Sequence, residues 1–340
     1  MIHHKTDMIK KRGLDNPREV RFQDYPDDAT IESRLKFLVN YAVLAPSTHN
    51  TQPWLFRVLN HTVEIHADRS RALPVLDPED RCLTISCGSC IALMESALSV
   101  FGFKWTTTLM PDFSNPDLLA RITVRGEADK ADVDTELARA IVSRSTIRRG
   151  FMNLPLPKAF LDSFDSDRDN SADTLCAIHD EEAERLILQQ TCSMEEDMEQ
   201  DIHFRRESES WTHPIRSRSR DGIPEKPGMS TPITVCWSDQ DAGTDTTRLS
   251  ALCVVSNTPL AWLSAGMTLM QALIEASRFG VNAAMINIPS EAKHLADVVS
   301  RLTSCNGIHV LLVRFGRPGR KVITQRRPLV DVMLHPGFSR

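Results

Sequence analysis

Residues 86–102 read SCGSCIALMESALSVFG, and residues 264–280 read SAGMTLMQALIEASRFG. A serine, a glycine, a phenylalanine and a closing glycine match between the two stretches, always at the same offset of 178 residues (264 − 86). Each stretch is an apolar run of helical length that closes on a glycine, as a helix with a left-handed C-terminal cap does. Similar segments at a fixed offset indicate a duplicated structural unit.

The sequence after each of these helices predicts strands, which extends the repeat to an α+β unit. Residues 120–124 follow the first helix and residues 309–315 follow the second, and both stretches have the composition of strands. A helix predicted over residues 134–143 marks the junction. We therefore expect two related α+β halves in tandem, residues 1–140 and 141–340.

The first half opens with an amphipathic helix near Thr30, which we expect Pro46 to end. Residues 54–59 and 62–67 then predict a β-hairpin around an Asn-His turn.

Length and composition are those of an ordinary globular protein. The 340 residues suggest about two domains, and hydrophobic residues make up 41% of the chain. The net charge is -5, with 40 basic and 45 acidic residues, so composition gives no support for a nucleic-acid partner.

The polar N-terminus has no apolar core of a secretory signal. Residues 249–274 carry no charge, yet they contain several serine, threonine, asparagine and proline residues. We expect a buried strand, a turn and a buried helix there rather than a membrane span. The expected location is the cytoplasm, without a membrane partner.

The chain contains eight cysteines, which we expect to be free thiols because no secretory signal precedes them. Cys82, Cys87 and Cys90 have the spacing of a plant-type ferredoxin cluster, but the next cysteine is 86 residues away (176 − 90). The second copy of the repeat has Ala265 and Thr268 in place of Cys87 and Cys90. We therefore expect these thiols to pack a helix, and we predict no metal site.

A candidate phosphate site follows the junction, where residues 144–148 read RSTIR. In an extended segment, Arg144, Thr146 and Arg148 point to the same side. Two planar guanidinium groups around a hydroxyl match the acceptor oxygens of a phosphate. Arg326 and Arg327 form a second basic pair near the C-terminus. The alternative for either group is a solvated charged surface.

Residues 45–54, which we call the corner, read APSTHNTQPW. Two prolines bracket small polar residues between a helix and a strand, a placement that can direct hydroxyl and amide groups at a polar ring. The alternative is a rigid turn whose side chains satisfy their own backbone. We expect His49 to be a structural residue of this turn rather than an acid or base.

These motifs together resemble the nitroreductase superfamily. Its hallmarks are an R-x-S/T-x-R segment, a P-S-x-x-N-x-Q-P-W segment, a glycine-terminated helix and a C-terminal basic pair, and all four occur here. The proline segment comes about a hundred residues before the arginine segment, an order that resembles the Acg branch, whose members fuse two nitroreductase-like halves. The resemblance, which covers residues 30–335, implies a mixed sheet covered by helices in each half, and halves that pack as a pseudo-dimer.

The resemblance also implies one FMN molecule bound between the halves. Its phosphate would be held by Arg144, Ser145, Thr146, Arg148, Arg326 and Arg327. The flavin ring would be contacted by Pro46, Ser47, Thr48 and Asn50. Near the reactive N5 would lie Pro289, Ser290 and Glu291, although Ala292 replaces the glycine that closes this turn in the family. A single site is expected, because the first half has no R-x-S/T-x-R segment of its own.

The family's chemistry implies transfer of a hydride from NAD(P)H to flavin N5, and from there to a nitro- or quinone-type acceptor, without a dedicated catalytic side chain. The alternative is a protein that binds or sequesters FMN in an occluded state, with little or no turnover. The complete arginine segment disfavours a purely structural fusion. Either a monomeric pseudo-dimer or a homodimer is compatible with the sequence.

Residues 203–230 are rich in charge, serine, proline and glycine, and their largest apolar residue is Trp211. So long a segment without periodicity is uncommon inside a domain unless it is functional or disordered. We expect a lid over the flavin cleft, anchored by Trp211 and followed by a strand at residues 233–237. The alternative is a mobile surface loop.

Overall fold

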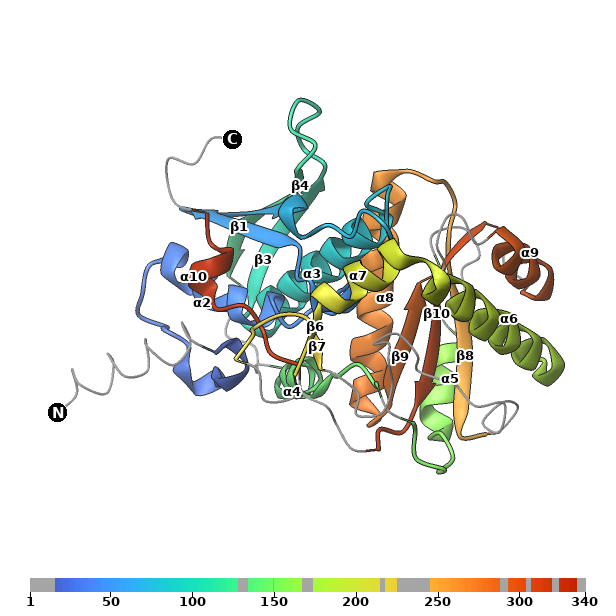
Figure 1. The fold of residues 1–340 in the computed structure, drawn as a ribbon. Helices are drawn as coiled ribbons and strands as arrows, with labels where there is room; N and C mark the ends of the chain where they lie inside the picture. The colour runs from blue at the N-terminus through green and yellow to red at the C-terminus, as the bar shows by residue number, and fades with distance from the viewer. Residues whose placement is uncertain are drawn as a thin grey trace.

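The computed structural model describes residues 16–127, 134–148, 150–166, 174–214, 218–224, 245–287, 293–303, 307–319 and 324–334. These residues form an α+β fold, as predicted. It contains two four-stranded sheets, with helices between and around them (Figure 1).

The first sheet has the strand order β1-β2-β4-β3. Its strands are β1 (Trp54–Leu59), β2 (Thr62–Ala67), β3 (Phe103–Leu109) and β4 (Leu118–Glu127). The hairpin of β1 and β2 has the predicted bounds, and Asn60 turns the chain with a left-handed φ of 52°, a conformation that asparagine tolerates better than most residues.

The second sheet has the strand order β5-β8-β10-β9. Its strands are β5 (Thr174–Ala177), β8 (Thr247–Val254), β9 (Asn282–Asn287) and β10 (Ile308–Gly316). The two sheets are connected in the same way. In the first, a long helix at residues 81–100 leads from β2 to β3, and β3 pairs with β4. In the second, a long helix at residues 259–278 leads from β8 to β9, and β9 pairs with β10.

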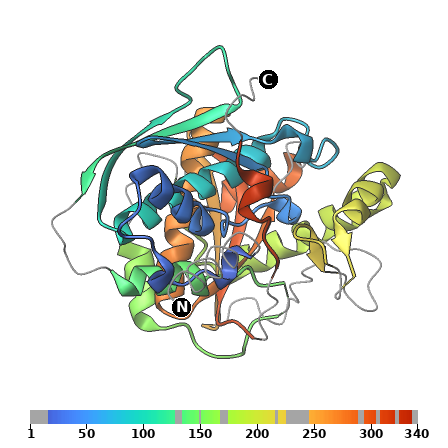
Figure 2. The same ribbon diagram turned by 90° about the vertical axis from the view of Figure 1, so that its left-hand side faces the viewer.

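All strand pairs described within these two sheets are antiparallel, so the expectation of mixed sheets is corrected. Parallel pairing enters through isolated bridges between Thr146 and Ala283 and between Phe56 and Met333. Through the second bridge, the C-terminal end of the described chain lies beside β1 of the first sheet. This segment includes α10 (Leu329–Val332) (Figures 1 and 2).

The two long helices, α3 (Arg81–Val100) and α8 (Pro259–Arg278), pack against each other in the centre of the molecule (Figure 1). They meet at two glycines. A Cβ on Gly88 would lie 2.1 Å from the carbonyl oxygen of Leu263, and a Cβ on Gly266 would lie 2.1 Å from that of Ile85. Only glycine permits so close a backbone approach. The two contacts are reciprocal, because Ile85 and Leu263 are separated by the same 178 residues as the glycines.

The predicted ends of these helices are confirmed. Gly102 and Gly280 follow them with φ of 74° and 70°. One hydrophobic core includes residues of both four-stranded sheets and of α3 and α8. By length and composition α3 passes the test for a membrane span among the described residues, but 83% of its apolar window is buried inside the structure. Residues 249–274 form most of β8 and α8, the strand, turn and helix that the sequence predicts.

The remaining helices surround these elements. They are α2 (Ile31–Ala42), α4 (Thr135–Ser143), α5 (Lys158–Ser166), α6 (Glu181–Gln200), α7 (Ile202–Ser210) and α9 (Lys293–Leu302). Thr30 caps α2 through its side chain, whereas the helix ends at Ala42, before Pro46. Short strands β6 (Thr212–His213) and β7 (Ile223–Pro224) pair in parallel.

Cys82, Cys87 and Cys90 are buried free thiols in α3, in keeping with the predicted packing role. Cys192 and Cys253 are also free. Cys176 is disulfide-bonded, so the prediction of free thiols is wrong for this residue.

Candidate functional site

The RSTIR segment runs from the end of α4 along β9, with an isolated parallel bridge between Thr146 and Ala283. The backbone N–H of Ser145 donates to Oδ1 of Asn282 (3.0 Å), and that of Ile147 donates to the carbonyl oxygen of Ala283 (2.8 Å). These bonds fix the segment at the edge of the second sheet. Arg144 is buried with 3% of its surface exposed, and Arg148 is half-buried. The alternative of a solvated charged surface therefore fails for Arg144.

Three guanidinium groups are linked through shared backbone oxygens. Nη2 of Arg144 and Nη2 of Arg326 both donate to the carbonyl oxygen of Leu44, at 3.0 Å each. Nη1 of Arg326 donates to the carbonyl oxygen of Thr324 (3.4 Å), and Nε of Arg18 donates to the same oxygen (2.9 Å). We call Arg18, Arg144, Arg148 and Arg326 the arginine cluster.

No carboxylate of the described residues forms an ion pair with any member of the arginine cluster. Burial, and then the charges of Arg18 and Arg148, lower the pKa of Arg144 to about 9. Burial lowers the pKa of Arg148 to about 10 and holds that of Arg326 well below its usual range. Buried charges without counter-ions are costly, so such a group of cations favours a bound anion.

Several polar atoms of this site have no hydrogen-bond partner within the described chain. They are Nε and Nη1 of Arg144, Nε of Arg148, Nε of Arg326, Oγ of Ser145 and Nδ1 of His49. Buried polar groups in native proteins are normally paired, so these atoms are candidate contacts for a ligand.

The corner lies directly against the arginine cluster. Oδ1 of Asn50 accepts from Nη1 of Arg326 (3.0 Å), and Oγ1 of Thr48 accepts from Nδ2 of Asn287 (3.1 Å). The corner, from the N-terminal part of the chain, thus meets Asn287 and Arg326 from its C-terminal part. The Asn50 amide also donates to the carbonyl oxygen of Gly222 (3.0 Å), so its polar atoms bind protein. Oγ of Ser47 accepts from the backbone N–H of Gln52 (2.9 Å).

The backbone of the corner is strained. His49, Asn50 and Gln52 have φ of 49°, 55° and 53°, in the left-handed region that non-glycine residues rarely adopt. Strain of this kind persists where the surrounding structure enforces it, often at binding sites. Burial, and then the charge of Arg148, lower the pKa of His49 to about 4, so its imidazole is neutral at pH 7.

The C-terminal basic pair divides between two environments. Arg326 joins the arginine cluster, whereas Nη1 of Arg327 pairs with Oδ2 of Asp68 (3.3 Å) and Nη2 donates to the carbonyl oxygen of Asp331 (2.6 Å). The backbone N–H of Arg327 donates to Oε1 of Gln52 (2.8 Å). Sequence reasoning assigned both residues to the phosphate; in the structure Arg326 is the one placed beside Arg144.

A segment that we call the strap contacts the corner at Asn50 and Gln52. We define it as residues 202–214 and 218–224, which include α7. Trp211 packs with Leu73, Leu76 and Phe204, and the guanidinium carbon of Arg71 lies 5.1 Å from its ring centre. The indole is therefore anchored against apolar residues, as the sequence predicts.

Besides the bond between Asn50 and Gly222, further hydrogen bonds hold the strap to residues 52, 75 and 76. The carboxylate of Glu207 accepts from the backbone N–H groups of Val75 and Leu76, at 2.9 Å each. The amide of Gln52 donates to the carbonyl oxygen of Arg220 (2.9 Å). Arg71 also forms an ion pair with Asp221.

Several predicted positions lie outside the described residues. These are Pro289, Ser290, Glu291, the strand at 233–237 and the end of the predicted lid. Arg18 was missed by sequence reasoning, because it lies in no R-x-S/T-x-R segment and meets Thr324 from a distance of 306 residues along the chain.

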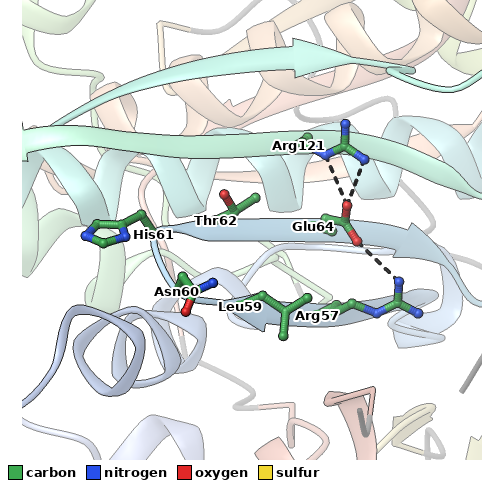
Figure 3. A pocket seen from close by; sticks show the side chains of 7 residues that line it. All are labelled: Arg57, Leu59, Asn60, His61, Thr62, Glu64 and Arg121. Carbon is green, nitrogen blue, oxygen red and sulfur yellow. Dashed lines mark hydrogen bonds and ion pairs between the residues drawn. The ribbon is translucent and has the colours of Figure 1, made fainter. Parts of the chain in front are cut away.

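A separate pocket of about 390 Å³ lies on the first sheet, lined by Arg57, Leu59, Asn60, His61, Thr62, Glu64 and Arg121. Glu64 stands between the two arginines and accepts hydrogen bonds from both (Figure 3).

Comparisons with known proteins complete this description. No family model matches the chain. A putative NAD(P)H nitroreductase of Mycobacterium tuberculosis is 28% identical over 312 residues, which cover 86% of each chain. The putative NAD(P)H nitroreductase acg of the same organism is 31% identical over 134 residues, 38% of this chain and 39% of that protein. The probable NAD(P)H nitroreductase PigM of a Serratia strain is 36% identical over 76 residues, 22% of this chain and 21% of that protein. These relatives support the nitroreductase superfamily and its Acg-like branch, and confirm the resemblance seen in the motifs.

Proposed function

We propose that this nitroreductase-like chain binds one FMN with its phosphate at the arginine cluster, and that it passes a hydride from NAD(P)H through the flavin to a nitro- or quinone-type acceptor. The observation that carries the proposal is the arginine cluster, in which Arg144 and Arg326 are buried. Its members have no carboxylate partner in the described chain and stand beside a strained polar corner. The names of the relatives support NAD(P)H as the electron donor.

The residues present fit a flavin phosphate. The unpartnered N–H groups of Arg144, Arg148 and Arg326 suit a dianion, and the Ser145 hydroxyl adds another donor. Charge-assisted hydrogen bonds are stronger where water is excluded. We assign Arg327 a positioning role, because Asp68 and Gln52 already engage it.

On the ring side, the corner supplies Pro46, Thr48 and His49. The Thr48 hydroxyl accepts from Asn287 at the boundary of the corner. His49 is neutral and half-buried, so it offers a hydrogen bond rather than an acid at pH 7. When bound, FMN would supply the hydride chemistry, and these residues would bind and orient it.

We also propose that the chain is a tandem duplication that packs as a pseudo-dimer, with halves at residues 1–140 and 141–340. Two observations support this. The sheets have corresponding strand orders around α3 and α8. The reciprocal contacts of Gly88 and Gly266 are those expected of equivalent residues beside a two-fold axis. One flavin per chain follows, because the RSTIR segment occurs once.

The test is to purify the protein, extract the cofactor with acid, and quantify it against protein. One FMN per chain is expected. Addition of NADPH without oxygen should then bleach the flavin spectrum. Two flavins per chain, FAD, or no flavin after reconstitution would contradict the proposal.

A second candidate function, FMN sequestration with little turnover, is favoured by the strap. The strap binds Asn50 and Gln52 through hydrogen bonds and would thereby cover one side of the corner. A cover that excludes water and electron acceptors would slow the reaction of a bound flavin with acceptors in solution. A flavin-loaded protein that NADPH fails to bleach would support this function over the first.

A further inference from the structure

Arg18 brings a fourth guanidinium group to the anion site from the N-terminal segment. It lies in the short 3-10 helix Pro17–Glu19 and donates through Nε to the carbonyl oxygen of Thr324 (2.9 Å). The same oxygen accepts from Nη1 of Arg326 (3.4 Å). Arg18 and Arg326 are thus neighbours through one shared acceptor, as Arg326 and Arg144 are through Leu44.

Like charges held this close repel one another unless an anion lies between them. Arg18 has no ion-pair partner among the described residues, and burial lowers its pKa. A phosphate monoester carries roughly −1.5 to −2 charge at pH 7, so it can compensate several of these cations at once.

We propose that Arg18 is a phosphate-binding residue of this site, and that it makes the site selective for phosphorylated flavin over the unphosphorylated form. The inference rests on the proposed function. The N-terminal segment and the RSTIR segment would then bind the same part of the ligand, its phosphate, although more than a hundred residues separate them in the sequence.

The segment that carries Arg18 has anchors of its own, so a substitution there is interpretable. The ring of Phe22 stacks on that of Phe101 with centroids 4.7 Å apart, and the ring of Tyr25 lies 4.2 Å from the same ring. Val20 is buried. Removal of the Arg18 guanidinium should therefore leave the segment in place.

The test compares Arg18→Ala and Arg18→Lys with wild type in titrations of flavin-free protein. Arg21→Ala is the matched control, because Arg21 lies in the same segment but is exposed. Arg18→Ala should weaken FMN binding by roughly 10-fold, the effect of one charged hydrogen bond, and leave riboflavin binding within about 2-fold. Arg18→Lys should recover most of the FMN affinity, and Arg21→Ala should match wild type.

Unchanged FMN affinity in Arg18→Ala would overturn the inference, and so would equal losses for FMN and riboflavin, which a structural role would produce. If the wild type binds no flavin, the proposed function fails, and inorganic phosphate becomes the probe. A rise in Tm with phosphate that is smaller in Arg18→Ala than in wild type supports the anion site. Equal rises in both proteins would overturn it.

Discussion

The first sheet and the arginine cluster each gather arginines, but in opposite electrostatic settings. On the sheet, Nε and Nη2 of Arg121 lie 3.0 and 2.9 Å from one oxygen of Glu64, and Nη1 of Arg57 lies 3.5 Å from the other (Figure 3). The arginine cluster contains no such carboxylate in the described chain. Arg121 is 43% exposed in its side chain, whereas Arg144 is almost completely buried.

The difference shows which arginines require a ligand. A solvated, paired arginine is stable as it stands, and its ion pair contributes little. A buried arginine without a counter-ion raises the free energy of the folded protein until an anion binds. The open pocket beside Glu64 is therefore a weaker candidate for an anion site than the enclosed cluster, in spite of its volume.

The largest expected effect is on cofactor affinity. Arg144→Ala should weaken FMN binding by roughly 10- to 150-fold, because it removes a charged hydrogen bond worth about 1.5–3 kcal/mol. The matched control Arg121→Ala should change the affinity by less than about 2-fold, since Glu64 already neutralises that residue. Fluorescence titration of flavin-free protein measures both. Equal effects of the two variants would remove the distinction between the sites.

The second effect has opposite signs at the two sites. Arg144→Met removes an uncompensated buried charge, and should raise the unfolding free energy of the flavin-free protein by about 1–3 kcal/mol. Arg121→Met should lower it by at most about 1 kcal/mol, since it removes a half-exposed ion pair. Urea denaturation measures both values. A destabilised Arg144→Met protein without flavin would mean that the guanidinium is already compensated.

The third effect is a pH dependence that originates at His49. Its pKa falls from 6.5 in the unfolded chain to about 4 in the fold, so the unfolded state binds more protons between these values. The unfolding free energy is therefore highest above pH 6.5. It decreases as the pH falls towards 4, by about 1 kcal/mol per pH unit at most. His309, whose pKa burial also lowers to about 4, adds a similar background.

His49→Asn should flatten this profile, and asparagine tolerates the left-handed backbone at that position. His61→Asn is the control on the sheet pocket, because His61 is exposed and its substitution should leave the profile unchanged. The measurement is the unfolding free energy of the flavin-free proteins from pH 4.5 to 8. An unaltered slope in His49→Asn would show that the imidazole is not buried as a neutral group.

The elements of the fold could be predicted where their signals are local. The hairpin of β1 and β2 follows from alternation and a turn at Asn60, and the ends of α3 and α8 follow from Gly102 and Gly280. The antiparallel character of the sheets was missed, because strand direction depends on pairings between segments far apart in sequence.

The site was predicted in part for the same reason. Arg144 and Arg148 belong to one short motif, so their common face follows from the period of an extended chain. Arg18 enters through a contact across 306 residues, for which a single sequence holds no signal. Arg326 and Arg327 are adjacent, and contacts with distant residues decide which of them faces the cluster: Asp68 and Gln52 engage Arg327, and Leu44 accepts from Arg326.

The smallest expected effect concerns access, in which the two sites also differ. The sheet pocket is open, whereas the strap contacts the corner beside the arginine cluster, with Arg71 bonded to Asp221 and stacked on Trp211. Asp221→Ala removes the ion pair with Arg71, which joins the strap to the first-sheet side of the corner, and also the contacts of Asp221 with Ser219 and His213 inside the strap. A partly exposed ion pair of this kind contributes about 0–1 kcal/mol. The open population of the strap should then rise by at most about 5-fold, and the rate of anaerobic flavin reduction by NADPH should rise by the same factor.

FMN content should stay at the wild-type level, because Asp221 is not part of the arginine cluster. Glu64→Ala, which breaks the ion pairs of the sheet pocket, is the control and should leave the rate unchanged. A reduction rate in Asp221→Ala that equals the wild-type rate would show that the strap does not limit access to the flavin.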